Sequence, residues 1–191
     1  MTFRLGFVTG ATPDKWARAW RDRRPEPLEL VPLTEADQES AVREGLVDMA
    51  IVRLPVDRTD LHCIRLYEEL PVVVASRDHF IAAADDEVAV TELSGEQLVR
   101  PHASGWTPEA DQLDWPPMTE KDAVETVAAG TGVALMPMSI ARLYQRKDVV
   151  QRIVSDLDPT EVGLIWLIDR DGEDTQTFVG ITRGRTARSS R

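Results

Sequence analysis

Strand-like and helix-like patterns alternate through the first 54 residues, and this order restricts the possible folds more than any other feature of the chain. Short apolar runs typical of strands lie at Arg4–Val8, Leu28–Leu33 and Met49–Leu54. Helix signals lie between them, at Pro13–Arg24 and Thr34–Gly45. A strand–helix–strand–helix–strand order predicts a parallel sheet with right-handed crossovers, and therefore an α/β fold.

A second series of patterns follows, and Pro71 suits a change of lobe because proline cannot donate to a sheet. The expected strands are Leu61–Tyr67, Pro71–Ala75, Val88–Val90, Gln97–Arg100, Val133–Met136, Val149–Val154 and Val162–Ile168. The expected helices are 119–130, 138–147 and Asp174–Arg183. Residues 101–118 hold four prolines and two tryptophans and predict a long irregular connection, which is often functional or mobile.

Residues 119–137 predict a tight corner between a helix and a short buried strand. Thr119 and Asp122 have capping-box spacing, with Asp in place of the usual Glu. Gly130 stands where a glycine ends a helix, and Gly132 allows a close backbone approach. Such a corner suits the lip of a small-molecule cleft, and it is equally typical of an ordinary helix-to-strand connection.

Length and composition favour a globular cytoplasmic protein. The 191 residues can bury a full core as one domain or two small lobes. The sequence lacks an apolar run long enough to span a membrane and an N-terminal secretory signal. A single cysteine, Cys63, excludes an internal disulfide and a zinc–cysteine cluster.

The net charge of −11 opposes binding to a phosphate backbone. The last nine residues carry four arginines and no acid, so removing them leaves residues 1–182 at −15. This basic end is interpreted either as a frayed, solvated terminus or as a weak contact with nucleic acid or a partner.

The sequence also lacks the common catalytic signatures. It contains no G-x-S-x-G, H-E-x-x-H, P-loop or G-x-G-x-x-G motif. We therefore expect no catalytic residues, no metal site and no cofactor.

Three motifs in a particular order carry a resemblance to a known family. They are G-L-V-D-M-A-I-V at 45–52, L-Y-E-E-L-P-V-V-V-A-S-R-D-H at 66–79 and V-A-A-G-T-G-V-A-L-M-P at 127–137. From about Phe3 to about Gly180, the chain resembles the effector-binding (substrate-binding) domain of LysR-type transcriptional regulators. The resemblance implies a sensor that binds a small metabolite and forms a homodimer. The helix N-terminus and the arginines at strand ends favour an anionic metabolite.

The resemblance also implies two Rossmann-like lobes of periplasmic-binding-protein type II architecture, joined by two crossover segments. Lobe I would comprise 1–72 and 156–185, and lobe II would comprise 73–155, followed by a basic tail at 186–191. The effector would lie between the lobes, at the carboxyl ends of the strands.

One departure from the family concerns DNA. Family members begin with a winged helix-turn-helix, whereas here the expected first sensor strand, F-R-L-G-F-V, comes directly after the start of the chain. We therefore expect a sensor without its own DNA-reading head and without specific DNA binding. The alternative is a solute-binding protein of a transport system, which shares the two-lobed design but would need an export or lipid signal.

In lobe I the candidate ligand-binding residues follow the first three strands. The first loop contributes Thr9, Gly10, Ala11 and Thr12. Thr12 is a good N-cap before Pro13, and a helix N-terminus at a strand's carboxyl end favours an anion. Plain capping is the alternative there, and also for Thr34 after the second strand.

The end of the third strand contributes Arg53 and Leu54. An arginine at a buried strand end needs an acid or a ligand, so Arg53 could grip a ligand carboxylate with two hydrogen bonds. It could instead pair with one of three nearby acids, Asp57, Glu68 or Glu69.

In lobe II the candidates are Arg100 and His102 after a strand, and Thr131 and Gly132 in the glycine corner. Trp106 and Trp115 could stack on a planar ligand or pin their proline-rich loop to the body of the protein. Trp16 and Trp20 are interpreted as core residues or as part of a subunit contact.

Overall fold

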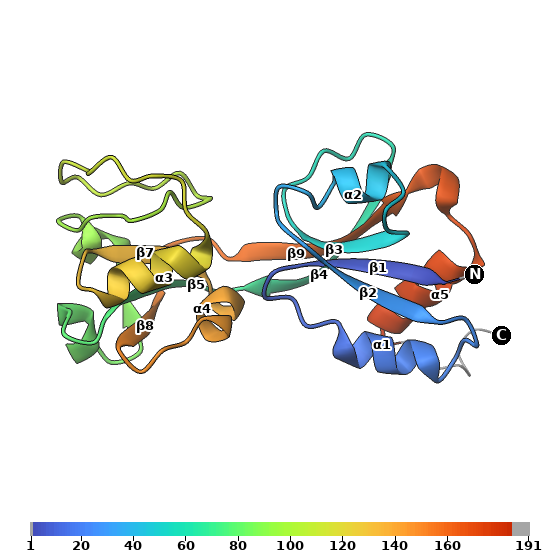
Figure 1. Ribbon diagram of the computed structural model, residues 1–191, viewed down its shortest axis with the longest axis horizontal. Coiled ribbons are helices and arrows are strands. Elements are labelled where there is room, and N and C mark those ends of the chain that lie inside the picture. The colour runs from blue at the N-terminus through green and yellow to red at the C-terminus, as the bar shows by residue number, and fades with distance from the viewer. Residues whose placement is uncertain (1, 185–191) are drawn as a thin grey trace. The chain divides into compact units, whose positions relative to one another are not determined.

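The computed structural model describes residues 2–184 and divides into two compact α/β units (Figure 1). Unit 1 contains the chain up to Glu68 and from Glu161 onwards, and unit 2 contains Glu69–Thr160. The chain therefore passes between the units twice, so the predicted two-lobed α/β fold with two crossover segments is confirmed. The basic tail predicted at 186–191 lies outside the described residues.

Unit 1 is built on a five-stranded sheet with the order β2-β1-β3-β9-β4. Its strands are β1 (Phe3–Val8), β2 (Leu28–Leu33), β3 (Met49–Arg53), β4 (Leu61–Glu69) and β9 (Thr160–Leu167). Strand β1 runs parallel to both β2 and β3, which confirms the parallel arrangement predicted for the first three strands. Strand β9 joins β3 in the antiparallel direction.

The helices of unit 1 are α1 (Asp14–Arg21), α2 (Ser40–Arg43), the 3-10 turn η3 (Ile168–Arg170) and α5 (Glu173–Thr182). Helix α2 is much shorter than the helix predicted from Thr34, because residues 35–39 form turns. Trp20 is fully buried and stacks on Phe3 with ring centroids 4.6 Å apart, and Trp16 is also buried. The core interpretation of these two tryptophans is therefore confirmed.

Unit 2 is built on a four-stranded sheet with the order β6-β8-β5-β7. Its strands are β5 (Pro71–Ser76), β6 (Glu87–Val88), β7 (Val133–Pro137) and β8 (Val149–Val154). The central strand β5 is antiparallel to both β7 and β8. The predicted strand Gln97–Arg100 is wrong, because only Leu98 makes a bridge, to Val133.

The helical segments of unit 2 are η1 (Phe80–Ala83), η2 (Val90–Leu93), α3 (Glu120–Ala128) and α4 (Met138–Leu143). Helix α3 begins with the predicted capping box, since Thr119 accepts from the Asp122 amide at 3.2 Å and Asp122 accepts from the Thr119 amide at 3.1 Å. Residues on α3, β5 and β7 share one hydrophobic cluster, so α3 covers this face of the sheet.

The long connection 101–118 is irregular, as predicted, but glutamine side chains tie it to the preceding segment. Gln97 accepts from the Leu113 amide and donates to the Asp111 carbonyl, both at 2.8 Å. Gln112 accepts from the Leu98 amide at 2.7 Å and donates to the Glu96 carbonyl at 3.0 Å. The connection is therefore held by side-chain amides where strand pairing is missing.

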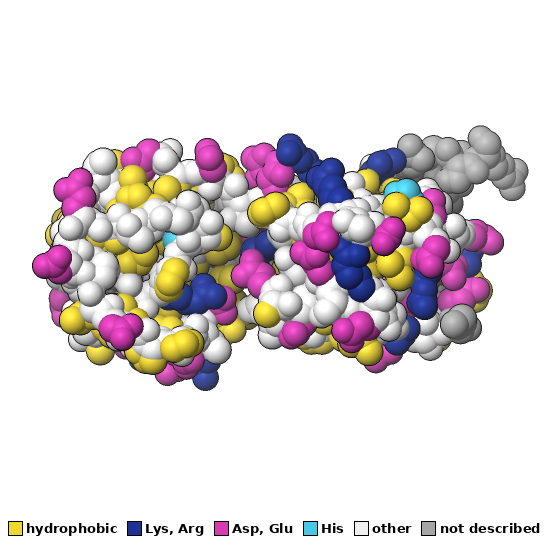
Figure 2. All heavy atoms as spheres, turned by 90° about the horizontal axis from the view of Figure 1, so that it is seen from above, with side chains coloured by type: hydrophobic (Ala, Val, Ile, Leu, Met, Phe, Trp, Pro, Cys, Tyr) yellow, Lys and Arg dark blue, Asp and Glu magenta, His cyan; other side chains and the backbone are white. Residues whose placement is uncertain are grey.

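Charged side chains of both signs are interspersed over the face of the molecule in Figure 2. Among the described residues, none of the helices is long and apolar enough to cross a membrane.

Candidate functional site

The predicted ligand-binding residues of unit 1 gather at one edge of the sheet. Strands β1, β2 and β3 are parallel neighbours, so the loops that follow them leave from the same edge. Thr9 follows β1, Thr34 follows β2, and Arg53 ends β3. Arg53 contacts residues of the loops after β1 and β2, so the three strand ends form one polar cluster.

Arg53 connects the loops of this cluster to one another. Its side chain is only 4% exposed. The guanidinium Nη2 donates to the Thr9 carbonyl at 2.8 Å, and Nε lies 3.8 Å from a carboxylate oxygen of Glu35. Asp57, one of the predicted partners, instead lies 3.6 Å from Arg43. Burial of a cation with this geometry is favourable only when polar groups surround it, and loop residues supply them here.

Gln38 is a member of the cluster that the sequence reasoning missed. It is buried, with 8% exposure, and lies in the turns between β2 and α2. Its side-chain oxygen accepts from the Arg53 amide at 2.9 Å, and its side-chain nitrogen donates to the Arg53 carbonyl at 3.0 Å. A glutamine in a helix-like segment of charged residues carries no local signal of such a role.

The threonines of the cluster differ in what their hydroxyl groups bond. The Thr34 hydroxyl forms hydrogen bonds within its own loop. Its Oγ1 donates to the Asp37 carboxylate at 2.6 Å and accepts from the Asp37 amide at 3.2 Å. The prediction that Thr12 caps α1 is wrong, because Pro13 is the N-cap and makes no side-chain cap. Within residues 2–184, the hydroxyls of Thr9 and Thr12 have no hydrogen-bond partner, so both can serve a ligand.

The remaining candidates of unit 1 shape the backbone. Gly10 has a φ of 89°, which suits glycine, and the Ala11 amide donates to the Val8 carbonyl at 3.0 Å. Leu54 packs its side chain against the hydrophobic cluster that includes Val52, and its amide donates to the Glu161 carbonyl at 2.9 Å. These residues turn the loop and close the strand, and their side chains offer no polar group.

In unit 2, Arg100 lies beside the start of α3. Its Nη2 is 2.9 Å from a carboxylate oxygen of Glu120, and its Nε donates to the Met118 carbonyl at 3.3 Å. It lines a hollow of about 400 Å³ with apolar neighbours Val99, Pro101, Trp115, Pro116, Pro117 and Met118. The Arg100 charge is thus already paired with an acid.

His102 follows Pro101, which lines this hollow, and it forms a hydrogen bond with Ser104, with 2.8 Å between Nδ1 and Oγ. Burial lowers the pKa of His102 from the usual histidine value, and the nearby Arg100 charge lowers it further. His102 is therefore neutral at pH 7 and can act as a hydrogen-bond donor or acceptor, without adding positive charge to the site.

Thr131 and Gly132 lie at the other end of α3. The Thr131 hydroxyl donates to the Thr126 carbonyl at 2.9 Å, near the C-terminus of the helix. Gly132 has a φ of 103°, and a Cβ there would lie 2.3 Å from the Gln97 carbonyl oxygen. The close approach predicted at this glycine is therefore to the protein's own backbone, and α3, about 13 Å long, separates the corner from Arg100.

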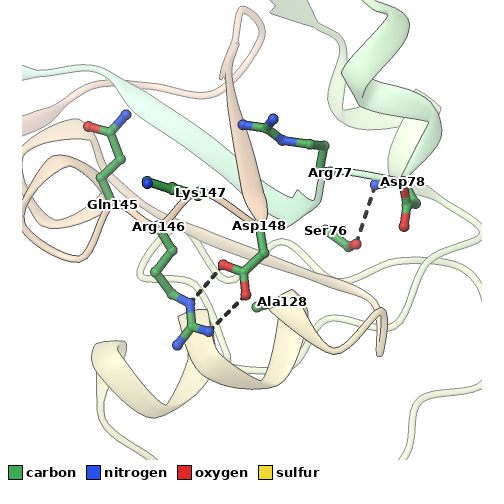
Figure 3. A pocket seen from close by; sticks show the side chains of 8 residues that line it. All are labelled: Ser76, Arg77, Asp78, Ala128, Gln145, Arg146, Lys147 and Asp148. Atoms are coloured by element: carbon green, nitrogen blue, oxygen red, sulfur yellow. Dashed lines mark hydrogen bonds and ion pairs between the residues drawn. The ribbon is translucent and has the colours of Figure 1, made fainter.

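A second hollow in unit 2, of about 750 Å³, lies at the turns that follow β5 and precede β8 (Figure 3). Arg146 makes two hydrogen bonds to the Asp148 carboxylate, at 2.9 and 2.8 Å, and they lower the pKa of Asp148 to about 2. Ala128, the last residue of α3, lines the same hollow. Cations near a helix C-terminus are favourable by themselves, which explains this basic rim without a ligand.

Within the described part of the chain, no group of three or more His, Cys, Asp or Glu side chains could hold a metal ion.

Comparison with known proteins gives one family. Residues 2–187 match the family model of the LysR substrate binding domain. The Hca operon transcriptional activator HcaR of Escherichia coli is 25% identical over 202 residues, which cover 96% of this chain and 67% of that protein. The HTH-type transcriptional regulator CatR of Pseudomonas putida is 28% identical over 169 residues, which cover 76% and 53%. The chain thus spans about half to two thirds of these relatives' length.

Solved structures agree on the fold. The effector binding domain of BenM with its effector benzoate superposes with a TM-score of 0.77, at 19% identity, over 98% of this chain and 93% of that one. A mutant of OxyR from Corynebacterium glutamicum gives a TM-score of 0.74, at 19% identity, over 96% and 63%.

Proposed function

The chain belongs to the family of LysR substrate-binding domains, and from this membership we propose that it senses a small organic anion. The effector-binding role in transcriptional regulation follows from the family, and a solute-binding protein of a transport system is not favoured. We propose binding without chemical conversion, since the relatives are transcriptional regulators.

The observation that carries the anion proposal is the cluster at the carboxyl edge of β1, β2 and β3. Arg53 brings a buried positive charge to this edge, and the hydroxyls of Thr9 and Thr12 stand in the adjoining loop with no partner among the described residues. A guanidinium with neighbouring hydroxyl donors suits a carboxylate. BenM, a structural relative, has the carboxylate benzoate as its effector, and this agrees with the proposed ligand class. The position between the two lobes stays a prediction from the resemblance.

A thermal-shift screen tests the ligand class. Small organic acids should raise the melting temperature, while amines and neutral sugars should not. A ligand at 100 times its dissociation constant stabilises the folded state by about 2.7 kcal/mol, which is a readily measured shift. A consistent preference for cationic compounds would contradict the proposal.

We also propose that the protein acts in the cytoplasm as a homodimer and does not bind DNA specifically through this chain. The net charge of −11 and the mixed charges in Figure 2 oppose contact with phosphates. Sedimentation analysis tests the dimer. Gel shifts with promoter and random fragments test DNA binding, and a sequence-selective shift by these 191 residues would refute that part.

A further inference from the structure

The backbone of Arg53 bonds a strand on one side and a side chain on the other. Arg53 lies opposite Val162 of β9, and the next amide, Leu54, donates to the Glu161 carbonyl at 2.9 Å. Backbone groups of successive strand residues point to opposite sides, so the amide and carbonyl of Arg53 point away from β9. The strand on that side is β1, but its pairing with β3 ends at Phe7 and Ile51.

The side chain of Gln38 takes the place of the missing strand. One carboxamide supplies both an acceptor and a donor, and both are used, at 2.9 and 3.0 Å. Both residues are buried, so neither bond is exchanged freely with water. Replacing Gln38 with an apolar residue would leave two buried backbone groups unsatisfied.

We infer that Gln38 is a positioning residue for Arg53, and that effector affinity depends on it. The second part rests on the proposed function. Gln38 holds the Arg53 backbone, and the Arg53 guanidinium then reaches the Thr9 carbonyl at 2.8 Å. The loops after β1 and β2 are thereby tied to the end of β3 before any ligand arrives. A charged group that is already ordered loses less freedom on binding, so affinity should fall when Gln38 is replaced.

Unit 2 offers a matched control. Gln112 makes the same kind of paired bonds, to the Leu98 amide at 2.7 Å and the Glu96 carbonyl at 3.0 Å, but it holds the long connection and not Arg53. Gln38→Met and Gln112→Met each remove one amide while keeping a similar side-chain volume. Gln112 also donates to the Ala110 carbonyl at 2.8 Å and is exposed, whereas Gln38 is buried. Both variants lose side-chain bonds to backbone groups, and only the first should affect Arg53.

The test uses the full 191-residue chain labelled with ¹⁵N. In Gln38→Met the Nε–H resonance of Arg53 should shift, and exchange of its backbone amide should accelerate about tenfold or more. The Leu54 amide, bonded to Glu161, should exchange as before and serves as an internal reference. Gln112→Met should leave both signals unchanged. An unchanged Arg53 resonance and exchange rate in folded Gln38→Met would overturn the inference.

Gln38→Glu provides a second variant if Gln38→Met does not fold. It keeps an acceptor for the Arg53 amide and loses the donor to the Arg53 carbonyl, so the amide should stay protected while the Nε–H resonance shifts. If both signals match the wild type, the positioning role is refuted.

Affinity is measured by calorimetry with benzoate, acetate and citrate as probes. Gln38→Met should weaken binding of the best probe about tenfold, and Gln112→Met should not. If the wild-type chain binds none of these acids, the proposed ligand class fails, while the resonance and exchange data still decide the role of Gln38. Unchanged affinity in Gln38→Met would refute the dependence on Gln38.

Discussion

Neighbouring strands run parallel in one part of unit 1 and mostly antiparallel in unit 2, and this difference decides which predicted site residues lie close together. In unit 1, β1, β2 and β3 are parallel, so the residues that follow each strand share one edge. In unit 2, β5 runs antiparallel to β7 and β8, so strand ends alternate between the two edges. The candidate residues at strand ends therefore form a cluster in unit 1 and lie apart from one another in unit 2.

The two units also differ in how they hold their candidate cations. The side chain of Arg53 is 4% exposed, donates to the Thr9 carbonyl and lies 3.8 Å from Glu35. The side chain of Arg100 is 34% exposed and lies 2.9 Å from Glu120. A buried charge is screened less by water and salt than an exposed one, so it interacts more strongly with an anion. We therefore expect unit 1 to contribute more of the affinity for an acid.

The largest effect is expected at the glycine corner of unit 2. Gly132→Val should lower the free energy of unfolding by about 3 kcal/mol or more, because positive φ strain adds to the clash with Gln97. Gly130→Ala is the control, with a φ of 87° but no atom within 4 Å of the added Cβ, and should cost about 1 kcal/mol. Chemical denaturation measures both. Equal losses of unfolding free energy in the two variants would mean that the clash with Gln97 contributes nothing beyond the strain of positive φ.

The next effect compares the two arginines directly. Arg53→Gln should weaken binding of an acid identified in the screen about tenfold or more, since a bond to a charged group is lost. Arg100→Gln should weaken it less, because the side chain of Arg100 is 34% exposed and solvent screens its charge. Calorimetry on both variants gives the two dissociation constants, and their ratio compares the two arginines. A larger loss in Arg100→Gln would reverse the ranking of the units.

A smaller effect separates two threonines within unit 1. Thr34→Ala should cost about 1 kcal/mol of stability, with unchanged affinity, because within residues 2–184 its hydroxyl bonds only Asp37. Thr12→Ala should leave stability within about 0.5 kcal/mol and reduce affinity about fivefold, the worth of one neutral hydrogen bond. Melting curves and titrations on each variant decide. Loss of affinity in Thr34→Ala would place that loop in the site.

The smallest effect is a pH dependence that His102 should contribute to unit 2. The pKa of His102 is lowered in the folded state by burial and by Arg100, so the unfolded chain binds the proton more readily. The contribution of His102 to the free energy of unfolding should therefore fall as the pH drops through the ordinary histidine pKa of about 6.5. Melting temperatures from pH 7.5 to 5.5 should decline less steeply in His102→Gln than in the wild type. Parallel profiles would rule out this contribution.

Local signals in the sequence located most elements correctly. Strands β2 and β8 have the predicted bounds, Leu28–Leu33 and Val149–Val154, because short apolar runs between polar turns are a strong local pattern. The capping box at Thr119 was also visible as a local pattern. The expected helix from Thr34 is reduced to Ser40–Arg43, and the expected strand at Gln97–Arg100 is reduced to a bridge at Leu98. Long-range hydrogen bonds through Gln38 and Gln112, which no local pattern records, hold both segments.

The sequence by itself determined most of the order of strands and helices and the loops that carry polar residues, since neighbours along the chain decide these features. The two-lobed class was predicted from the family resemblance of three motifs and not from local patterns. Only the tertiary structure decided which of those residues meet. Gln38 reaches Arg53 across 15 positions, and Arg53 reaches Thr9 across 44. Such contacts depend on strand direction and on where pairing stops, which no local pattern records.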